Sequence, residues 1–292
     1  MNEWKKWPIK IIEQKDFPAN LKLVTPLPEK LFYRGEWNKK IFENVLAVVG
    51  SRKITRYGKE IIEKMMPEIV FRKTTVISGF MYGVDSEAHW KCLELGGKTI
   101  AVLGNGLDYL YPTENDKLYT EILKTGGLVM SEYERDFKAT TWTFPQRNRI
   151  VSGLSTAGIL IIEAGIKSGS LITAKLGLAQ KKNILAIPGP INSKTSEGTN
   201  WLIKSGAARM ITTPSDIFED KIQFPEQESL FKDYSNLSGL EVNIIDILEN
   251  EAVSVDEICQ KIKKPINEVS TTLSMMMIKD LIMEEDGKFY IN

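Results

Sequence analysis

The residues from 144 to 155, FPQRNRIVSGLS, hold the side chains of this chain that are best suited to binding a polyanion. Arg147 and Arg149 flank Asn148, and the aromatic ring of Phe144 comes just before them, ahead of a proline. Guanidinium groups pair with phosphate oxygens, and a nearby aromatic ring offers a surface on which a base can stack. These residue types in this order predict a site for a nucleic-acid backbone.

Small residues at the ends of apolar runs add backbone N–H groups to the same site. Residues 168–170, Ser-Gly-Ser, precede a predicted helix over 171–180, whose unpaired first N–H groups attract anions. A run over 45–49 ends in Gly-Ser-Arg, where the glycine lets a phosphate approach Arg52. A run over 74–77 is followed by two glycines four residues apart, a spacing that suits a loop cradling an anion or another backbone segment. The candidate binding residues are Ser51, Arg52, Gly79, Gly83, Lys138, Phe144, Arg147, Asn148, Arg149, Ser168, Gly169 and Ser170.

Three other titratable residues have alternative roles. Asp85 is placed to cap the helix that contains His89, and we favour capping over catalysis. His89 is the only histidine and is predicted to lie in the core. Glu163 is either an ion-pair partner of Arg147 or Arg149 or a catalytic acid, and we favour the ion pair.

The charge of the chain is unevenly distributed, although its net charge is zero. Residues 45–211 carry 22 Lys and Arg against 15 Asp and Glu, and residues 1–44 carry 9 against 6. Residues 212–292 carry 7 against 17. A polyanion is attracted to the middle of the chain and repelled by its end, unless this is only the ordinary variation of charge along a sequence.

Cysteine usage and the N-terminal residues indicate a cellular compartment. The two cysteines, Cys92 and Cys259, lie far apart, and no Cys/His spacing predicts a zinc site. The first residues lead into no apolar signal core, and no apolar run is long enough to span a bilayer. The sequence predicts a cytoplasmic protein with free thiols, no membrane partner, no metal and no cofactor.

Apolar runs that alternate with helical patterns predict the fold class. The runs lie over 45–49, 74–77, 99–103, 128–130, 159–162 and 184–187, and a helical pattern follows the first over 57–71. Continuous apolar runs suit strands buried on both faces, and alternation with helices is typical of a doubly wound, mostly parallel, Rossmann-like sheet. The predicted core covers residues 45–212, and residues 1–44, interrupted by prolines, form an N-terminal lead-in packed on it.

The C-terminal part of the chain changes character. Residues 213–238 hold prolines, acidic residues and scattered aromatics, and are predicted to be a linker. Residues 239–292 contain three helical patterns, of which the second opens with a capping box at Ser254 and Glu257, and a hairpin with a turn at 286–287. This is the order of a small winged-helix domain. Its third helix has cations only at its ends, so contact with a protein fits it better than reading duplex DNA.

Several short motifs follow one another over roughly residues 15–215. They are Gly50-Ser51-Arg52, Ser78-Gly79 with Gly83-Val84-Asp85, Gly104-Asn105-Gly106 with Tyr111-Pro112, Phe144-Pro145-Gln146-Arg147-Asn148-Arg149, Ser168-Gly169-Ser170, Pro188-Gly189 and Gly198-Thr199-Asn200. In this order and spacing they resemble the DNA-processing protein A (DprA/Smf) family, whose winged C-terminal domain the chain also matches. Met81 and Tyr82 depart from the resemblance, because the family usually has an alanine and then a polar or basic residue there.

The resemblance implies a non-enzymatic, homodimeric protein that binds single-stranded DNA in natural transformation. It also implies that the protein protects incoming strands and helps to load a RecA-type recombinase onto them. Two other functions remain open. One is an enzyme on nucleotides or similar phosphates, with Glu163 and Asp85 as carboxylates, and the other is a scaffold that works through its acidic winged domain.

Overall fold

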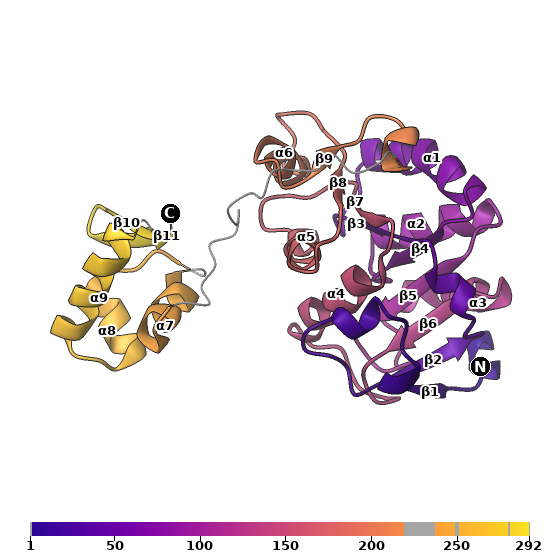
Figure 1. Cartoon of the computed structure of the whole chain (residues 1–292), viewed down its shortest axis with the longest axis horizontal. Helices are drawn as coiled ribbons and strands as arrows, with labels where there is room; N and C mark the ends of the chain where they lie inside the picture. The colour runs from indigo at the N-terminus through magenta and orange to yellow at the C-terminus, as the bar shows by residue number, and fades with distance from the viewer. Residues whose placement is uncertain (1, 219–236, 249–250, 280, 292) are drawn as a thin grey trace. The chain divides into compact units, whose positions relative to one another are not determined.

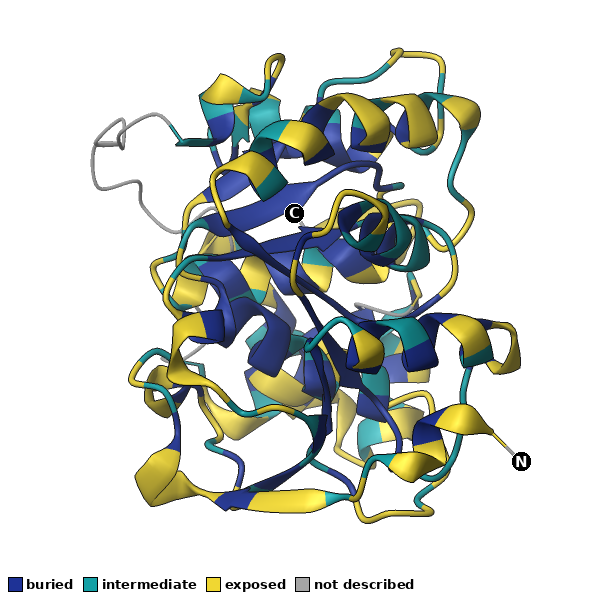
Figure 2. Cartoon of the chain, turned by 90° about the vertical axis from the view of Figure 1, so that its right-hand side faces the viewer, coloured by how far each residue is buried: buried dark blue, intermediate teal, exposed yellow. Residues whose placement is uncertain are grey.

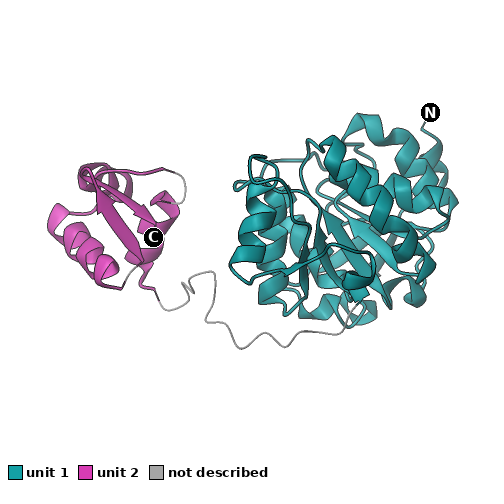
Figure 3. Ribbon diagram, turned by 90° about the horizontal axis from the view of Figure 1, so that it is seen from above, with its two compact units in different colours: residues 1–223 teal, residues 224–292 magenta. Residues whose placement is uncertain are grey.

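The computed structural model describes residues 2–218, 237–248, 251–279 and 281–291, which form two compact units (Figure 1, Figure 3). Unit 1 comprises residues 1–223 and unit 2 comprises residues 224–292. Most of the predicted linker, 219–236, lies outside the described residues. Near the start of the predicted linker 213–238, Ser215–Phe218 form a short 3-10 helix whose Ile217 is buried among apolar residues of unit 1.

Unit 1 is built on a sheet with the strand order β1-β2-β6-β5-β4-β3-β7-β8-β9. The neighbouring strands from β6 to β9 in this order are parallel, while β1 and β2 pair antiparallel at one edge. The strands are β1 (Lys10–Glu13), β2 (Lys30–Gly35), β3 (Val45–Val49), β4 (Thr75–Ser78), β5 (Thr99–Leu103), β6 (Leu128–Ser131), β7 (Gly158–Ile161), β8 (Ile184–Ala186) and β9 (Arg209–Met210).

Helices cover both faces of this sheet, so the strands are buried between two helical layers (Figure 2). One layer holds α1 (Arg56–Phe71), α2 (Val84–Glu94) and α3 (Asp116–Lys124). The other holds α4 (Thr143–Leu154), α5 (Gly169–Ala179) and α6 (Glu197–Lys204). All five residues of β3 are buried, which explains why the strands read as continuous apolar runs. The predicted doubly wound, mostly parallel sheet is confirmed, and β3 to β8 lie within one residue of the predicted runs.

The sheet has a topological switch point between β3 and β7. From β3 the chain adds β4, β5 and β6 on one side, and β7, β8 and β9 on the other. The loop after β3 leads to α1 on one face, and the loop after β7 leads to α5 on the opposite face. Open α/β sheets bind their ligands in the crevice that such diverging loops leave at the carboxyl ends of the strands.

The N-terminal residues belong to the sheet as well as packing on it. Strand β2 pairs with β6, with Phe32 opposite Ser131, and β1 continues the sheet outward. The ring of Trp4 stacks on Tyr119 of α3 with centroids 4.6 Å apart. The segment therefore extends the sheet by two strands, which the sequence did not predict because its apolar residues have no regular period.

Helix α4 was also missed from the sequence. Pro145 lies within this helix, but only as its third residue. A first-turn proline costs no intrahelical hydrogen bond, since the N–H groups of that turn have no partner within the helix.

Unit 2 has its own apolar core, formed by three helices and a hairpin. The elements are α7 (Gly239–Leu248), α8 (Val255–Ile262), α9 (Ile266–Ile278), β10 (Ile282–Glu285) and β11 (Lys288–Ile291). Ser254 and Glu257 form the predicted capping box at the start of α8. This is the element order predicted for a winged helix. No helix in the described parts of either unit is long and apolar enough to cross a membrane.

Candidate nucleic-acid interface

A cavity of about 640 Å³ lies at the switch point of unit 1. Its wall combines the loop after β3, the start of α4 and the start of α5. Among the residues that the structure describes, one carboxylate, that of Asp85, lines it, whereas five cationic side chains do so. These are Arg52, Lys53, Arg147, Lys167 and Lys194. The excess of positive charge in a concave site favours an anionic ligand.

An arginine and an aromatic ring face each other on this wall. The guanidinium carbon of Arg52 lies 5.2 Å from the centroid of the Phe144 ring, a cation–π distance. Arg52 is exposed and Phe144 is half-buried. The ring also lies 6.0 Å from that of Tyr111, and a side chain at Gly104 would collide with it, which fixes its place. A positive group and a ring beside each other suit one phosphate and one base.

The guanidinium of Arg147 lies beneath Gly79. It is buried, and its Nη1 donates to the carbonyl of Val102 at the end of β5. A Cβ added at Gly79 would lie 2.2 Å from Nη1, so only glycine leaves room for this group. Burial lowers the pKa of Arg147 to about 10, and the nearby Asp85 opposes that shift. The group keeps its positive charge at neutral pH and contributes it to the cavity from below.

Asp85 stabilises the loop that holds Gly79 rather than the helix start. Its Oδ2 accepts a hydrogen bond from the backbone N–H of Met81, 3.3 Å away, and the N-cap of α2 is Gly83. The prediction that Asp85 caps the helix containing His89 is therefore wrong. Burial raises the pKa of Asp85, while Arg147 counteracts the rise. Met81 is buried and lines the cavity, and Tyr82 next to it donates from its hydroxyl to Glu114.

Gly83 shapes the site without lining the cavity. Its φ of +76° is a left-handed conformation, and a Cβ there would lie 2.3 Å from the carbonyl oxygen of Ser51. The next residue, Val84, donates its N–H to the same oxygen at 3.1 Å. Gly83 therefore lets the loop after β4 pack against the loop that carries Ser51 and Arg52.

The start of α5 closes the cavity on the other side. Ser168 is the N-cap, and its hydroxyl accepts a bond from the N–H of Ser170. Asn148 of α4 donates to the carbonyl of Gly169 at 3.4 Å, which joins the two helices. All four residues line the cavity, so the predicted juxtaposition of α4 with this helix start is present.

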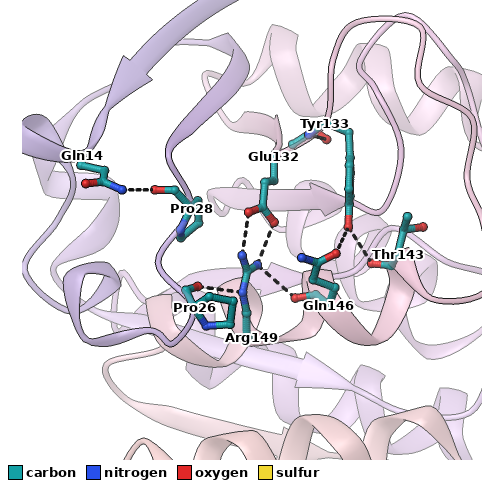
Figure 4. Close-up of polar contacts among 9 residues, drawn as sticks. Gln14, Pro26, Pro28, Glu132, Tyr133, Thr143, Gln146 and Arg149 are labelled. Atoms are coloured by element: carbon teal, nitrogen blue, oxygen red, sulfur yellow. Dashed lines mark hydrogen bonds and ion pairs between the residues drawn. The ribbon is translucent and has the colours of Figure 1, made fainter.

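Arg149 does not line the cavity, unlike Arg147. Figure 4 shows that Arg149 instead contacts Glu132, Pro26 and Gln146. Its two terminal nitrogens bind both carboxylate oxygens of Glu132, at 2.8 and 2.6 Å. Its Nε donates to the carbonyl of Pro26 at 2.9 Å, and Nη1 also donates to that of Gln146. The side chain is buried with these partners, so we remove Arg149 from the proposed phosphate contacts.

Lys138 is exposed in the loop before α4 and lies outside the cavity lining. Three lysines that the sequence reasoning missed do line it, namely Lys53, Lys167 and Lys194. Two of them directly adjoin motif residues, since Lys53 follows Arg52 and Lys167 precedes Ser168. That adjacency was the available signal.

Glu163 and His89 are buried and are not part of the cavity lining. The carboxylate of Glu163 accepts from the N–H of Thr55 at 2.9 Å and from its hydroxyl at 2.5 Å, with Thr195 as a further donor. These partners replace the predicted arginine and hold the N-cap residue of α1. His89 lies in the core as predicted, bonded to Thr99 at 2.6 Å, and burial lowers its pKa to about 3.

The family of this chain follows from comparison with known proteins. A family model described as DNA recombination-mediator protein A matches residues 9–221, which include every residue of the cavity. The chain belongs to this family. The curated relatives include the protein Smf of Escherichia coli K12, 36% identical over 281 residues, which are 94% of this chain and 74% of that protein. They also include the DNA processing protein DprA of Streptococcus pneumoniae, 36% identical over 75% of this chain and 76% of that protein.

Solved structures of DNA recombination-mediator proteins share the fold of unit 1. DNA processing protein A from Streptococcus pneumoniae is 36% identical with a TM-score of 0.67, over 75% of this chain and 77% of that chain. The protein from Helicobacter pylori is 31% identical with a TM-score of 0.65, over 73% of this chain and 94% of that chain. That structure describes a single-stranded DNA binding mode. Membership of the family places this chain among proteins of DNA processing and recombination.

Proposed function

We propose that this protein binds single-stranded DNA in the cavity at the switch point. The observation that carries the proposal is the cavity wall, which five cations share with a half-buried aromatic ring and the start of a helix. Phosphates and bases alternate along a single strand at the spacing of a nucleotide. A wall with cations beside a ring satisfies both kinds of group at once.

Each side chain has a distinct role in this proposal. Arg52 is exposed and contacts a phosphate, while Arg147 adds its charge from beneath Gly79. The start of α5, with the N–H of Gly169 and the hydroxyls of Ser168 and Ser170, binds a second phosphate. Phe144 stacks on a base, and the three lysines of the lining attract the backbone between these points.

The same geometry favours single strands over duplex DNA. Phe144 is half-buried within the wall, so a base reaches its ring only if it is unpaired and turned out of a stack. Bases of every kind present a π-face, and the backbone contacts read no sequence. We therefore expect slight sequence preference together with a strong preference for single strands.

Equilibrium binding tests the proposal. A fluorescent deoxythymidine strand is titrated with the full chain at several salt concentrations, and unlabelled single strands or duplexes of the same length compete. The proposal expects single strands to compete far better, with affinity falling as salt rises because counterions are released. Competition by duplex that equals or exceeds that of single strands would contradict it.

Family membership supports further steps, in which the bound strand is protected and passed to a RecA-type recombinase by a homodimer. A candidate dimer surface is the region 198–210, where Trp201 of α6 and Met210 of edge strand β9 are partly exposed, while Leu202 is buried against the sheet. Light scattering at micromolar concentration is expected to give the mass of a dimer. Addition of the protein is expected to speed the formation of RecA filaments on the single strands to which it is bound.

We propose that the protein binds DNA without catalysing a reaction. We also propose that it is cytoplasmic. The carboxylate of Glu163 is engaged with Thr55, and His89 is buried with a pKa of about 3, so neither is placed to transfer protons in the cavity. Cys92 and Cys259 are both free thiols, which suits a reducing compartment. Nucleotide turnover in the presence or absence of DNA would contradict the non-enzymatic proposal.

A further inference from the structure

The loop between β6 and α4, residues 132–142, carries an exposed ring beside the cavity. Trp142 is 55% exposed and is the N-cap residue of α4. Its neighbour Thr141 lines the cavity, as does Phe144 two residues further on. Trp142 is therefore continuous with the cavity wall, although it is not itself part of the lining.

Packing holds this ring in place. Tyr133 and Phe137 stack with centroids 4.8 Å apart and planes inclined by 17°, and Trp142 packs edge-on against both at 6.0 and 6.3 Å. The hydroxyl of Tyr133 donates to Gln146 of α4 at 3.0 Å. The carbonyl of Phe137 accepts from the N–H of Gly106 in the next loop at 2.8 Å. The ring is thus ordered before any ligand arrives, which reduces the entropy lost on binding.

The charged side chains of this loop offer no excess of positive charge to a DNA strand. Glu132 is paired with Arg149, and Glu134 with Lys30. Arg135 is paired with Asp108, and Asp136 adds a negative charge to the positive charge of exposed Lys138. Whatever this surface adds to the binding of a strand therefore comes from the aromatic ring rather than from charge.

We propose that Trp142 is a second base-stacking residue, which receives a base of the single strand where the strand leaves the cavity past Thr141. This inference rests on the proposed function of the cavity and extends it by one nucleotide position. A ring that is fixed by its neighbours, more than half exposed and continuous with a site that already holds Phe144 has the properties of a stacking platform. The ligand is a nucleic-acid base of any kind.

The test compares Trp142→Ala, Trp142→Phe and Phe71→Ala in the full chain. Phe71 is 81% exposed at the end of α1, which leads to the amino end of β4 and so away from the cavity at the carboxyl ends of the strands. It is therefore the matched control. Each protein is titrated with a base-bearing strand and with an abasic strand of the same length. Thermal unfolding of each variant verifies that it is folded.

We expect Trp142→Ala to weaken binding of the base-bearing strand by about fivefold, the lower end for loss of one stacked base. Trp142→Phe retains most of the affinity, and Phe71→Ala binds as the wild type does. The salt dependence of Trp142→Ala is unchanged, because no phosphate contact is lost. On the abasic strand, Trp142→Ala and the wild type bind equally.

Three results would overturn the inference. They are unchanged affinity of Trp142→Ala for the base-bearing strand, an equal loss on the abasic strand, and a loss that accompanies a change of oligomeric state. The last would make Trp142 a contact between two copies of this chain. Arg52→Ala, measured in the same series, separates this inference from the proposed function. If Arg52→Ala weakens binding and Trp142→Ala does not, the cavity function stands and only the second platform fails.

Discussion

The cavity and the attachment of the N-terminal segment both depend on an arginine of α4. Arg147 and Arg149 are two residues apart, which separates them by about 200° around the helix. Arg147 points beneath the loop at Gly79 beside the cavity, whereas Arg149 joins Glu132 and the carbonyl of Pro26. From the sequence, both residues were predicted to contact phosphate, whereas in the structure their roles differ. Arg149, with its carboxylate partner Glu132, serves folding, whereas Arg147, buried beneath Gly79, adds its positive charge to the cavity wall.

The largest expected effect lies at the N-terminal attachment. Arg149→Ala leaves Glu132 without its bidentate partner, although that carboxylate is only 18% exposed. Removal of one member of a buried pair costs about 3 to 5 kcal/mol, and partial exposure places this case toward the lower end. Urea unfolding measures it.

Arg56→Ala is the matched control for that experiment, because the Arg56 side chain is 93% exposed and pairs with Glu60 one turn away. Such a surface pair contributes less than about 1 kcal/mol. Equal losses of stability from Arg149→Ala and Arg56→Ala would refute the structural role given to Arg149.

The next largest effect is the dependence of stability on pH that arises from buried His89, near Arg147. Burial, with the charge of Arg147 adding to it, lowers the pKa of His89 from 6.5 to about 3. The unfolded chain therefore binds a proton between these pH values that the folded chain does not. Stability attributable to His89 is full above pH 6.5 and falls as pH decreases toward 3, by about 3 kcal/mol at pH 4.

Unfolding curves between pH 4 and pH 7 measure this loss, and His89→Asn is the comparison because its amide can still bond to Thr99. The pH dependence of the variant should be flatter than that of the wild type. Parallel curves would remove His89 as the cause.

On the cavity side, Arg52→Ala changes binding and leaves stability nearly unchanged. Loss of one charged contact weakens single-strand binding by about tenfold. It also flattens the plot of log affinity against log salt by about 0.7. Arg56→Ala is again the control, since Arg56 is exposed but does not line the cavity. An unchanged slope and affinity would take Arg52 out of the interface.

The smallest effect is expected from unit 2. Residues 239–292 carry 5 Lys and Arg against 11 Asp and Glu, a balance that repels a phosphate backbone. Deletion of these residues should leave single-strand affinity equal or slightly higher, and the difference should shrink with salt because charges are screened beyond about 8 Å at physiological ionic strength. Loss of binding by a core that circular dichroism shows to be folded would assign the interface to unit 2.

The sequence predicted those features that depend on local patterns. The parallel strands follow from continuous apolar runs, and the capping box at Ser254 and Glu257 was found from its spacing. The cavity residues from Ser51 to Ser170 could be named because strand ends and helix starts meet at one edge of a parallel sheet.

Features that depend on distant contacts could not be predicted. The partner of Glu163 is Thr55, 108 residues away, and the partner of Arg149 depends on where the loop with Glu132 packs. The pairing of β2 with β6 likewise joins short segments far apart in the chain. The residues adjacent to Arg147 and Arg149 in the sequence do not indicate that the two side chains have different partners in the fold.

The central claim is that a single strand lies in the cavity of unit 1. Photocrosslinking of a bromodeoxyuridine strand to the full chain, followed by peptide mapping, tests it most directly. A strand in the cavity is expected to give crosslinks in peptides that contain Phe144 and the segments 50–53 and 167–170. Crosslinks confined to residues 239–292 would contradict it.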